Sequence, residues 1–267
     1  MKFDSLEDKM NYYRDLTDYR LMPNSYVIAM IDGRGFSGKI KKRFKLPFDD
    51  TFINIMNEIG KFVAKEVQGC KFAFVQSDEI SFILTDFDTP ETDAFFGYRL
   101  CKMQSIIAGL ATAKFNQLIY KMLCETPCST SDLQQIIDDQ PAYHFDCKCW
   151  TVPNHNDACA WILYRQIDCI RNSKQQAAQT YLSHKTLVNK STDEQVELLK
   201  AEKGIDWNTE YDDGKKYGRF IYKVEKTLYT PEHEPYTRNT FEVHNGCPLT
   251  EDENREYFKK LIPQKNS

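Results

Sequence analysis

The spacing of hydrophobic and polar positions in the first part of the chain predicts three strands and a helix. Residues 26–32 form an apolar run with β-branched side chains, which predicts a buried strand that ends at Asp32. Apolar positions recur at helical spacing over residues 50–67 and predict an amphipathic helix. Two short apolar runs, at residues 71–76 and 79–84, predict the strands of a hairpin. The order so far is strand, helix and hairpin.

The rest of the chain is more helical in its pattern. Residues 92–122 predict a long helix, residues 143–149 a further strand, and residues 156–182 and 191–203 two more helices. Residues 5–20 predict a short opening helix. Weak strand candidates come later in the chain, at Ile205–Asn208, Phe220–Val224 and Thr240–Val243. The last twenty residues are polar, and we expect them to be frayed.

This order of elements predicts an α+β fold of the ferredoxin-like type. In such a βαββαβ unit, an antiparallel sheet carries its helices on one face. We expect the unit to occupy residues 1–150, and residues 151–267 to form a smaller helical and extended part. The topology brings Asp32, at the end of the first strand, close to Asp78, at the turn of the hairpin.

Asp32 and Asp78 would then form an oxygen-rich site at one edge of the sheet. Mg²⁺ usually binds through one or two carboxylates together with substrate phosphates. Two such ions support in-line displacement at phosphorus. The pair therefore predicts a phosphoryl- or nucleotidyl-transfer enzyme with two Mg²⁺ ions. An isolated aspartate at a strand end more often caps a helix or is solvated, so this prediction depends on the pair.

The composition excludes several classes of protein. Of 267 residues, 41% are hydrophobic and 28% charged, which is typical of a globular protein and not of a disordered one. No apolar run approaches the roughly 20 residues that span a bilayer, and the first residues lack the apolar core of a signal peptide. We therefore expect no membrane association and a cytoplasmic location. The nine cysteines are then expected to be reduced.

The net charge of −4 gives no overall positive field for nucleic acid. Basic residues gather instead in one stretch after Asp32, which contains Lys39, Lys41, Lys42, Arg43 and Lys45. This stretch is either a solvated loop or a contact for the phosphates of a polyanion. A Cys/His cluster at residues 144–159 is either a zinc site or, as its Cys-x-Cys spacing favours, a set of buried thiols.

Several motifs, in their order and spacing, resemble one known family. They are Ile31-Asp32-Gly33-Arg34-Gly35-Phe36, Pro47-Phe48-Asp49, Gln76-Ser77-Asp78-Glu79-Ile80-Ser81-Phe82, Arg99 with Lys102 and Ser105, Phe145-Asp146, Pro153, Tyr164-Arg165-Gln166-Ile167-Asp168-Cys169 and Arg171-Asn172-Ser173. Over most of residues 5–225 the chain resembles the tRNA-histidine guanylyltransferase superfamily. It is most similar to the Thg1-like-protein branch, the reverse (3′-to-5′) polymerases.

The resemblance implies a polymerase-type palm and a nucleotidyltransferase that extends tRNA at its 5′ end. ATP would first adenylylate a 5′-monophosphate, and the 3′-hydroxyl of an incoming GTP or other nucleotide would then displace AMP. Template-dependent repair of truncated tRNAs and a homotetramer are also implied. Residues 151–267 would complete the catalytic unit and contact tRNA.

Two departures from the eukaryotic guanylyltransferases favour the Thg1-like branch. Those enzymes carry a His-Ile-Asn-Asn-Leu-Tyr-Asn motif after an Asp-Cys pair, where this chain has Cys169-Ile170-Arg171-Asn172-Ser173. Their first loop also has a histidine where this chain has Ser37. Both changes favour 5′-end repair. Addition of a single G at position −1 of tRNA-His is the alternative within the family.

The carboxylate pair and the resemblance together assign candidate residues to four tasks. Catalysis is assigned to Asp32, Asp78 and Glu79, although Glu79 either supports the site or forms a salt bridge. Metal binding is assigned to Asp32, Asp78 and, by resemblance, the carbonyl of Gly33. Nucleotide binding is assigned to Asp32, Gly33, Arg34, Gly35, Phe36, Ser37, Ser77, Asp78, Arg99 and Lys102. Binding of tRNA is assigned to Lys41, Lys42, Arg43, Arg165, Arg171 and Lys174.

Two functions outside this family stay open on the residues alone. A nucleotide cyclase also uses two strand-end carboxylates on a palm-like domain, and would release a cyclic nucleotide without RNA. A non-catalytic RNA-binding scaffold has no need of a carboxylate pair, because the pair repels phosphate. Such a scaffold would keep its RNA affinity after loss of Asp32 and Asp78.

Overall fold

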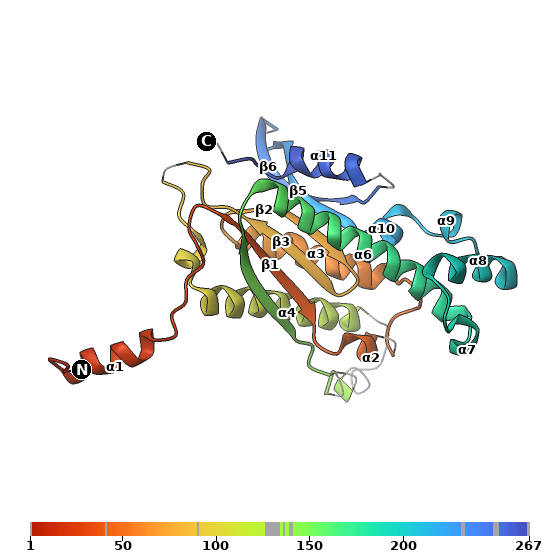
Figure 1. The fold of residues 1–267 in the computed structure, drawn as a ribbon, viewed down its shortest axis with the longest axis horizontal. Coiled ribbons are helices and arrows are strands. Elements are labelled where there is room, and N and C mark those ends of the chain that lie inside the picture. Colours follow the sequence, from red (N-terminus) through yellow and green to blue (C-terminus); the bar gives the residue numbers. More distant parts are fainter. Residues whose placement is uncertain are drawn as a thin grey trace.

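A six-stranded antiparallel sheet forms the centre of the protein, with strand order β4-β1-β3-β2-β5-β6 (Figure 1). The computed structural model describes residues 2–40, 42–89, 91–125, 134–135, 137–138, 141–230, 233–247 and 251–265. In chain order the strands are β1 (Tyr26–Gly33), β2 (Cys70–Gln76), β3 (Glu79–Leu84), β4 (Phe145–Val152), β5 (Arg219–Tyr229) and β6 (Pro235–Asn245). The first four strands and their two long connecting helices have the predicted βαββαβ order, which confirms the fold class.

Helices cover both faces of this sheet and extend beyond it. They are α1 (Leu6–Asp15), α2 (Phe36–Ile40), α3 (Asp50–Glu66), the 3-10 helix η1 (Phe95–Tyr98), α4 (Leu100–Cys124), α6 (His155–Tyr181), α7 (His184–Leu187), α8 (Thr192–Lys203), α9 (Trp207–Glu210), α10 (Asp213–Tyr217) and α11 (Glu251–Leu261). Helices α3 and α4 belong to the βαββαβ unit and lie on one face of the sheet, as expected. The other face is covered by α6 and α11.

Residue alternation along the strands gives each face its own hydrophobic core. In β1, Val27, Ala29 and Ile31 pack toward α3 and α4, whereas Ile28 packs toward α6. All four side chains are fully buried. The strand therefore reads as a continuous apolar run, which is typical of a strand covered on both faces. Strands β5 and β6 extend the same sheet beyond β2 and belong to the part of the chain after residue 150.

Two local predictions for the C-terminal part are wrong. Residues 205–208 do not form a strand, because the carboxylate of Asp206 accepts a hydrogen bond from the amide of Asn208 and caps the short helix α9. The last twenty residues are not simply frayed, because α11 places Phe258 and the following Ile262 in the second core, both fully buried. Only a narrow stripe of apolar side chains on this otherwise polar helix packs against the sheet.

The long helix also begins later than the pattern predicts. Residues Phe96 and Gly97 have positive φ angles of 51° and 56°, which break the helical backbone within η1. Regular helix begins only at Leu100 and continues to Cys124. The apolar spacing of this region cannot reveal the break, because the side chains on both sides of it pack into the same core.

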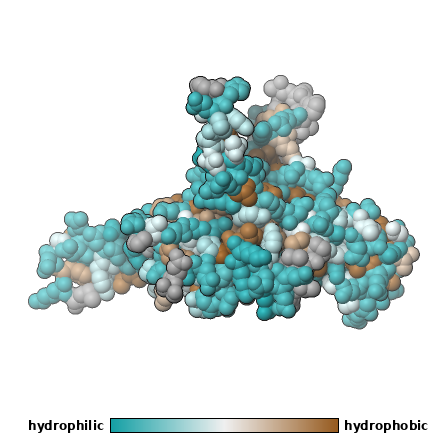
Figure 2. Space-filling model, turned by 90° about the horizontal axis from the view of Figure 1, so that it is seen from above, coloured by the Kyte–Doolittle hydropathy of each residue, from teal (hydrophilic) through white to brown (hydrophobic). Residues whose placement is uncertain are grey.

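Helix α1 extends away from the body of the protein, and no residue in it is buried (Figure 1). The apolar side chains of Leu6 and Met10, and of Leu16 just after the helix, are exposed. Hydrophobic atoms lie between hydrophilic ones on this arm in the space-filling view (Figure 2). Within the described residues, no helix is long and apolar enough to cross a bilayer.

Candidate active site

Three acidic residues form a row across neighbouring strands at one end of the sheet. In the antiparallel register, Asp32 of β1 lies opposite Asp146 of β4 on one side and opposite Glu79 of β3 on the other. Residues that lie directly opposite each other in an antiparallel pair point to the same face. The side chains of all three therefore lie on the face covered by α6, beyond its apolar core.

Asp78 reaches the same end of the sheet from the β2–β3 turn. The amide of Gly33 donates to the carbonyl of Asp78 at 3.2 Å, which joins the end of β1 to this turn. The preceding Ser77 has a positive φ of 44°, and its hydroxyl donates to the Asp78 carboxylate at 3.0 Å. The structure thus brings Asp32 and Asp78 together, as the strand pattern predicts.

This concentration of negative charge leaves the carboxylates short of neutralising partners. Burial, followed by the charges of Asp78 and Asp146, raises the pKa of Asp32 to about 6, although Lys148 acts to lower it. Burial also raises the pKa of Asp78. Carboxylates held together against this cost suit a divalent cation, which would supply the missing positive charge.

The oxygen atoms at this site suit Mg²⁺, which takes part of its ligands from water and substrate, better than a metal ion that takes all its ligands from protein side chains. Among the described residues, no group of three or more His, Cys, Asp or Glu side chains is arranged to hold a metal ion. Asp32, Asp78 and a backbone carbonyl such as that of Gly33 offer a partial set of hard oxygen ligands. Mg²⁺ usually completes such a set with water and substrate phosphates.

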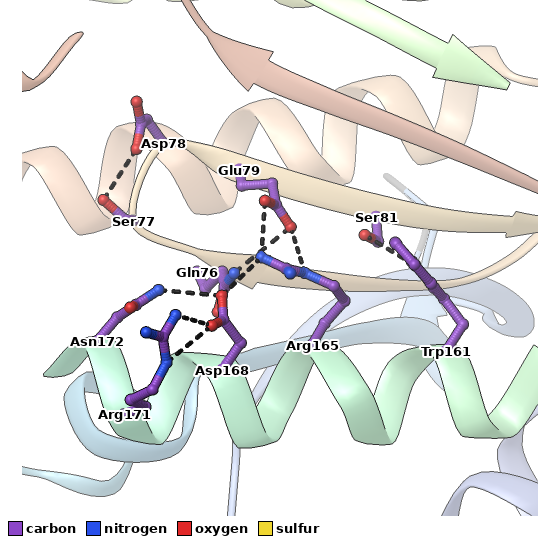
Figure 3. A network of polar contacts seen from close by, with 10 residues as sticks. All are labelled: Gln76, Ser77, Asp78, Glu79, Ser81, Trp161, Arg165, Asp168, Arg171 and Asn172. Carbon is purple, nitrogen blue, oxygen red and sulfur yellow. Dashed lines mark hydrogen bonds and ion pairs between the residues drawn. The ribbon is translucent and has the colours of Figure 1, made fainter. Parts of the chain in front are cut away.

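Glu79 forms the salt bridge that was one of its two predicted roles. Its carboxylate accepts from Nε and Nη2 of Arg165 at 2.7 and 2.8 Å, a two-pronged pairing with helix α6 (Figure 3). Arg165 also lies 3.1 Å from a carboxylate oxygen of Asp168. Burial raises the pKa of Glu79 to about 7, although the charge of Arg165 acts to lower it. Glu79 still lines the cavity beside Asp32 and Asp78.

Asp168 connects this ion pair to the surface of α6. Arg171 and Asn172, one turn further along the helix, both donate to its carboxylate (Figure 3). Burial acts to raise the pKa of Asp168, but the hydrogen bond from Arg171 and the charge of Arg165 outweigh it, so the pKa is lowered. Asp168 is therefore an ionised partner of Arg165 within α6, and Arg165 in turn joins the helix to the sheet through Glu79.

The glycine-rich loop after β1 is shaped by packing as well as by its open backbone. The Phe36 ring lies fully buried against Gly33, where an added Cβ would come within 2.5 Å of the ring. The amide of Arg34 donates to the carbonyl of His144, so it is already paired. Gly35 has a positive φ of 66°, and Ser37 is exposed. Phe36 is thus a core residue, and Gly35, Ser37 and the side chain of Arg34 are exposed parts of this loop that can face a ligand.

A cavity of about 450 Å³ opens beside the acidic row. This volume is in the range of sites for small molecules and cofactors. Its acidic end contains Asp32, Asp78 and Glu79. The remaining wall is apolar on one side and amide-rich on the other, and consists of Ile40, Phe44, Leu46, Pro47, Phe48, Phe52, Ile53, Gln76, Asn172, Gln175, Gln176, Gln179 and Arg219, among others.

The single chain does not bring Arg99 and Lys102 to this cavity. Arg99 pairs with Asp18 at 2.8 Å and bridges to Arg20, just before β1 begins and thus at the opposite end of that strand from Asp32. Lys102 lies 4.4 Å from the centre of the Phe96 ring. Their nucleotide-binding role stays a prediction, and it has no support from the geometry of one chain.

The residues predicted to bind tRNA are dispersed. Arg165 is only 8% exposed and lies between two carboxylates, so it is not the surface contact that was expected. Arg171 is exposed, and Lys174 pairs with Asp193 at 2.6 Å. Of the basic stretch, Lys42 is exposed and Arg43 half-buried, while Lys41 lies outside the described residues.

The Cys/His cluster is divided between the two faces of the sheet. The sulfur atoms of Cys147 and Cys149, both on β4, lie 3.7 Å apart and face the core under α4. Cys159 lies on α6 in the other core, where its sulfur is 3.7 Å from Nε2 of His155. This separation favours buried thiols over a shared zinc site.

Sequence reasoning missed Asp146, Asp168 and Arg219 as residues of this site. Strand alternation places Asp146 on a definite face of its strand, but not next to Asp32. Asp168 and Arg219 belong to α6 and β5, whose positions depend on contacts between distant segments. Asp146 and Asp168 lie within motifs that carry the family resemblance, so that signal could have found them, but no local pattern points to Arg219.

Residues 7–153 match the profile of the Thg1 family of tRNAHis guanylyltransferases. The chain belongs to this family. The tRNA(His) guanylyltransferase of Saccharomyces cerevisiae is 27% identical over 215 residues, which cover 76% of this chain and 85% of that protein. Members of the Thg1 family are nucleotidyltransferases, so the predicted family and enzyme class are confirmed.

Solved structures of the Thg1 family agree with this assignment over nearly the whole chain. A bacterial tRNA(His) guanylyltransferase (Thg1)-like protein in complex with ATP has a TM-score of 0.79 and 28% identity, and covers 97% of this chain and 99% of its own. A complex of such a bacterial protein with GTP has a TM-score of 0.74 and 27% identity, with the same coverage. The predicted palm-type fold is therefore shared with Thg1-like proteins.

The raised pKa of Asp32 predicts a pH-dependent response to Mg²⁺. An aspartate whose pKa is raised on folding favours the folded state at low pH, so stability without metal should fall as pH rises from about 4 through about 6. A cation needs the ionised carboxylate, so Mg²⁺ should raise the melting temperature more at pH 7.5 than at pH 5. Thermal unfolding across this range, with and without Mg²⁺, measures both trends.

The variant Asp146→Asn tests the cause of this shift. Loss of the neighbouring charge should lower the pKa of Asp32 and move the onset of the Mg²⁺ effect to lower pH. An unchanged onset would mean that burial and the charge of Asp78 set the shift without Asp146.

Proposed function

We propose that this protein is a template-dependent 3′–5′ nucleotidyltransferase that adds nucleotides to the 5′ end of truncated tRNA after ATP-dependent activation. The observation that carries the proposal is the convergence of Asp32 and Asp78 on one nucleotide-sized cavity. The ATP and GTP complexes of similar bacterial proteins support ATP and GTP as its nucleotides. The alternative is addition of a single G at position −1 of tRNA-His.

In the proposed reaction, Asp32, Asp78 and the Gly33 carbonyl hold two Mg²⁺ ions. Bound Mg²⁺ neutralises phosphate charge and favours in-line attack at phosphorus. The Gly35 amide and the hydroxyls of Ser37 and Ser77 hold phosphate oxygens at the same edge of the sheet. Both aspartates must be ionised for this task, and burial raises the pKa of each, that of Asp32 to about 6.

Glu79 and Arg165 act on this site through position rather than through direct chemistry. Their ion pair holds α6 against β3, and it keeps a third carboxylate next to Asp32 partly neutralised. The carboxylates of Asp32 and Asp78, which have no such ion pair, are then the ones that bind a cation. We assign Arg165 to positioning, in place of the RNA contact that its sequence context favours.

The tRNA is proposed to approach from the side of α6 and the basic stretch. Arg171, Lys174, Lys42 and Arg43 are the described candidates for phosphate contacts there. Residues 151–267 then complete the catalytic unit, since α6 supplies Arg165 and the amide-rich wall of the cavity. A homotetramer is part of this proposal, and Arg99 and Lys102 would need another copy of the chain to reach a nucleotide.

The decisive experiment incubates the protein with 5′-truncated tRNAs, ATP, GTP and Mg²⁺, and measures 5′ extension. We expect extension of several truncated tRNAs and weaker action on full-length tRNA-His. Extension of full-length tRNA-His alone would favour single G addition. Absence of extension on every tRNA would refute the proposal, and a cyclic nucleotide formed without RNA would indicate a cyclase instead.

A further inference from the structure

The cavity contains a buried arginine that the protein itself does not neutralise. Arg219 is only 4% exposed, and it lines the cavity at the start of β5. Its Nε donates to Oδ1 of Asn57 at 3.1 Å and its Nη1 to the carbonyl of Gly214 at 3.3 Å. Among the described residues, Nη2 has no hydrogen-bond partner and no carboxylate forms an ion pair with the guanidinium. Burial lowers the pKa of Arg219 to about 10.

Such an arrangement is costly unless a ligand completes it. A buried charge without an ionised partner and a buried donor without an acceptor each disfavour the folded state. Gln76, on the neighbouring strand β2, is in a similar position. It is 5% exposed, it lines the same cavity, and its Oε1 has no partner among the described residues. A ligand that enters the cavity is the partner that remains for both side chains.

The surroundings of Arg219 suit a nucleobase better than a phosphate. Its end of the cavity has an apolar wall from Phe44 to Ile53 and several glutamine side chains on α6. Phosphate sites gather several cations or free amides. Of the two described lysines that line the cavity, Lys215 is already paired with Asp50 and Asp212, and Lys45 lies at the exposed surface. An apolar wall with a few placed polar groups is typical of a pocket for a flat, partly polar ring.

The position of Arg219 also agrees with the length of a nucleotide. Strand order places β5 three strands from β1 and Asp32, or about 14 Å at the usual spacing between neighbours, and directly beside β2, which leads into the turn that carries Asp78. A nucleotide whose phosphates lie at Asp32 and Asp78 would therefore extend its base toward Arg219. This step rests on the proposed function, because it takes the acidic row as the phosphate end.

We propose that Arg219 is a specificity-determining residue that recognises the 6-carbonyl and N7 edge of a guanine nucleotide. Arginine donors match the two acceptors, O6 and N7, that guanine presents on this edge. Adenine presents a donor at position 6, which opposes a guanidinium donor. Gln76, through its unpaired Oε1, is the acceptor in the same cavity for an amino or imino group of the ligand.

The test measures equilibrium binding of nucleoside triphosphates to the full-length protein with Mg²⁺ present. Inosine triphosphate keeps the 6-carbonyl and N7 without the 2-amino group, and ATP lacks the carbonyl. Wild-type protein should bind GTP and inosine triphosphate more tightly than ATP. In Arg219→Met, the Kd for the first two should rise about tenfold or more, while the Kd for ATP stays within about twofold.

Two further variants separate recognition from charge and from fold. Lys215→Met removes a paired cation from the same cavity and should leave the ratio of GTP to ATP affinity unchanged. Arg219→Lys keeps the charge without the planar fork and should lose most of the preference for GTP. Melting temperature without nucleotide checks the fold of each variant. Arg219→Met removes a buried charge without an ionised partner but also the hydrogen bonds to Asn57 and Gly214, so the binding comparison stands as long as the variant unfolds cooperatively.

Each outcome decides between the inference and the function on which it rests. If Arg219→Met weakens the binding of GTP and ATP equally, or weakens neither, the ratio of the two Kd values is unchanged and base recognition by Arg219 is overturned. The proposed function stays intact in both cases, because the protein still binds both nucleotides. Failure of wild-type protein to bind either nucleotide would end both proposals. If Arg219→Met does not fold, a wild-type preference for ATP over inosine triphosphate would still overturn the inference.

Discussion

Asparagine in place of Asp78 should reduce nucleotide addition about a thousandfold and leave the protein folded. The substitution removes one of the two anionic oxygen donors at the sheet edge, and metal-ion stabilisation of a phosphoryl transition state is worth several kcal/mol. Asp78 is held at the cost of burial, which raises its pKa, so the neutral amide should not lower the melting temperature. The rate of 5′ extension and a thermal unfolding curve, measured on one preparation, test both parts.

A matched control for this variant lies at the other end of the same strand. Asp86 follows β3 and accepts a hydrogen bond from the amide of Asn24 at 2.7 Å. The substitution Asp86→Asn changes charge in the same way, far from the cavity, and should keep activity within about twofold. Mg²⁺ should raise the melting temperature of wild type and Asp86→Asn, but not that of Asp78→Asn. Full activity in Asp78→Asn would contradict the assignment of this site.

Local sequence patterns predict elements and the residues at their ends, but they do not predict contacts between distant segments. The apolar runs that end at Asp32 and flank Asp78 are local, and the βαββαβ order then places both residues at one edge. The pairing of Glu79 with Arg165 joins positions 86 residues apart, and no local pattern encodes it. The contact between Arg219 and Asn57 spans 162 residues. The acidic pair could thus be predicted, and its positioning partners could not.

Errors in the predicted elements have the same physical origin. Helix α11 is polar on average, and its few apolar side chains matter only because the second face of the sheet needs a cover. The polar composition of the last twenty residues predicts fraying, because composition alone does not show that one face of the sheet needs a covering helix. The break at Phe96 and Gly97 depends on backbone angles in a segment whose side chains look helical. Tertiary packing decides both cases.

Stability and catalysis make opposite demands on the acidic row. Asp32 and Asp78 are destabilising without a cation, as their raised pKa values indicate, yet the proposed reaction needs both ionised. The protein offsets part of this cost at Glu79, where Arg165 supplies a paired charge, and a smaller part at Asp32 through the charge of Lys148. Arg165 therefore determines how many uncompensated carboxylates the folded protein carries.

Methionine in place of Arg165 should accordingly destabilise the protein by about 3–5 kcal/mol near pH 8, because it leaves the largely buried carboxylate of Glu79 without its cation, while Asp168 keeps Arg171. The loss should be smaller near pH 5.5. Glu79 already has a pKa raised to about 7, and removal of Arg165 raises it further, so a proton neutralises Glu79 at the lower pH. Urea unfolding at both pH values measures the difference.

A second arginine on α6 provides the control for this prediction. Arg171 also pairs with Asp168, but its side chain is 59% exposed, so Arg171→Met should cost at most about 1 kcal/mol at either pH. The double variant Arg165→Met with Glu79→Gln removes the uncompensated charge and should regain much of the lost stability. If Arg165→Met is as stable as Arg171→Met at pH 8, the ion pair does not hold α6 to the sheet. Arg165 would then again be available as a contact for tRNA.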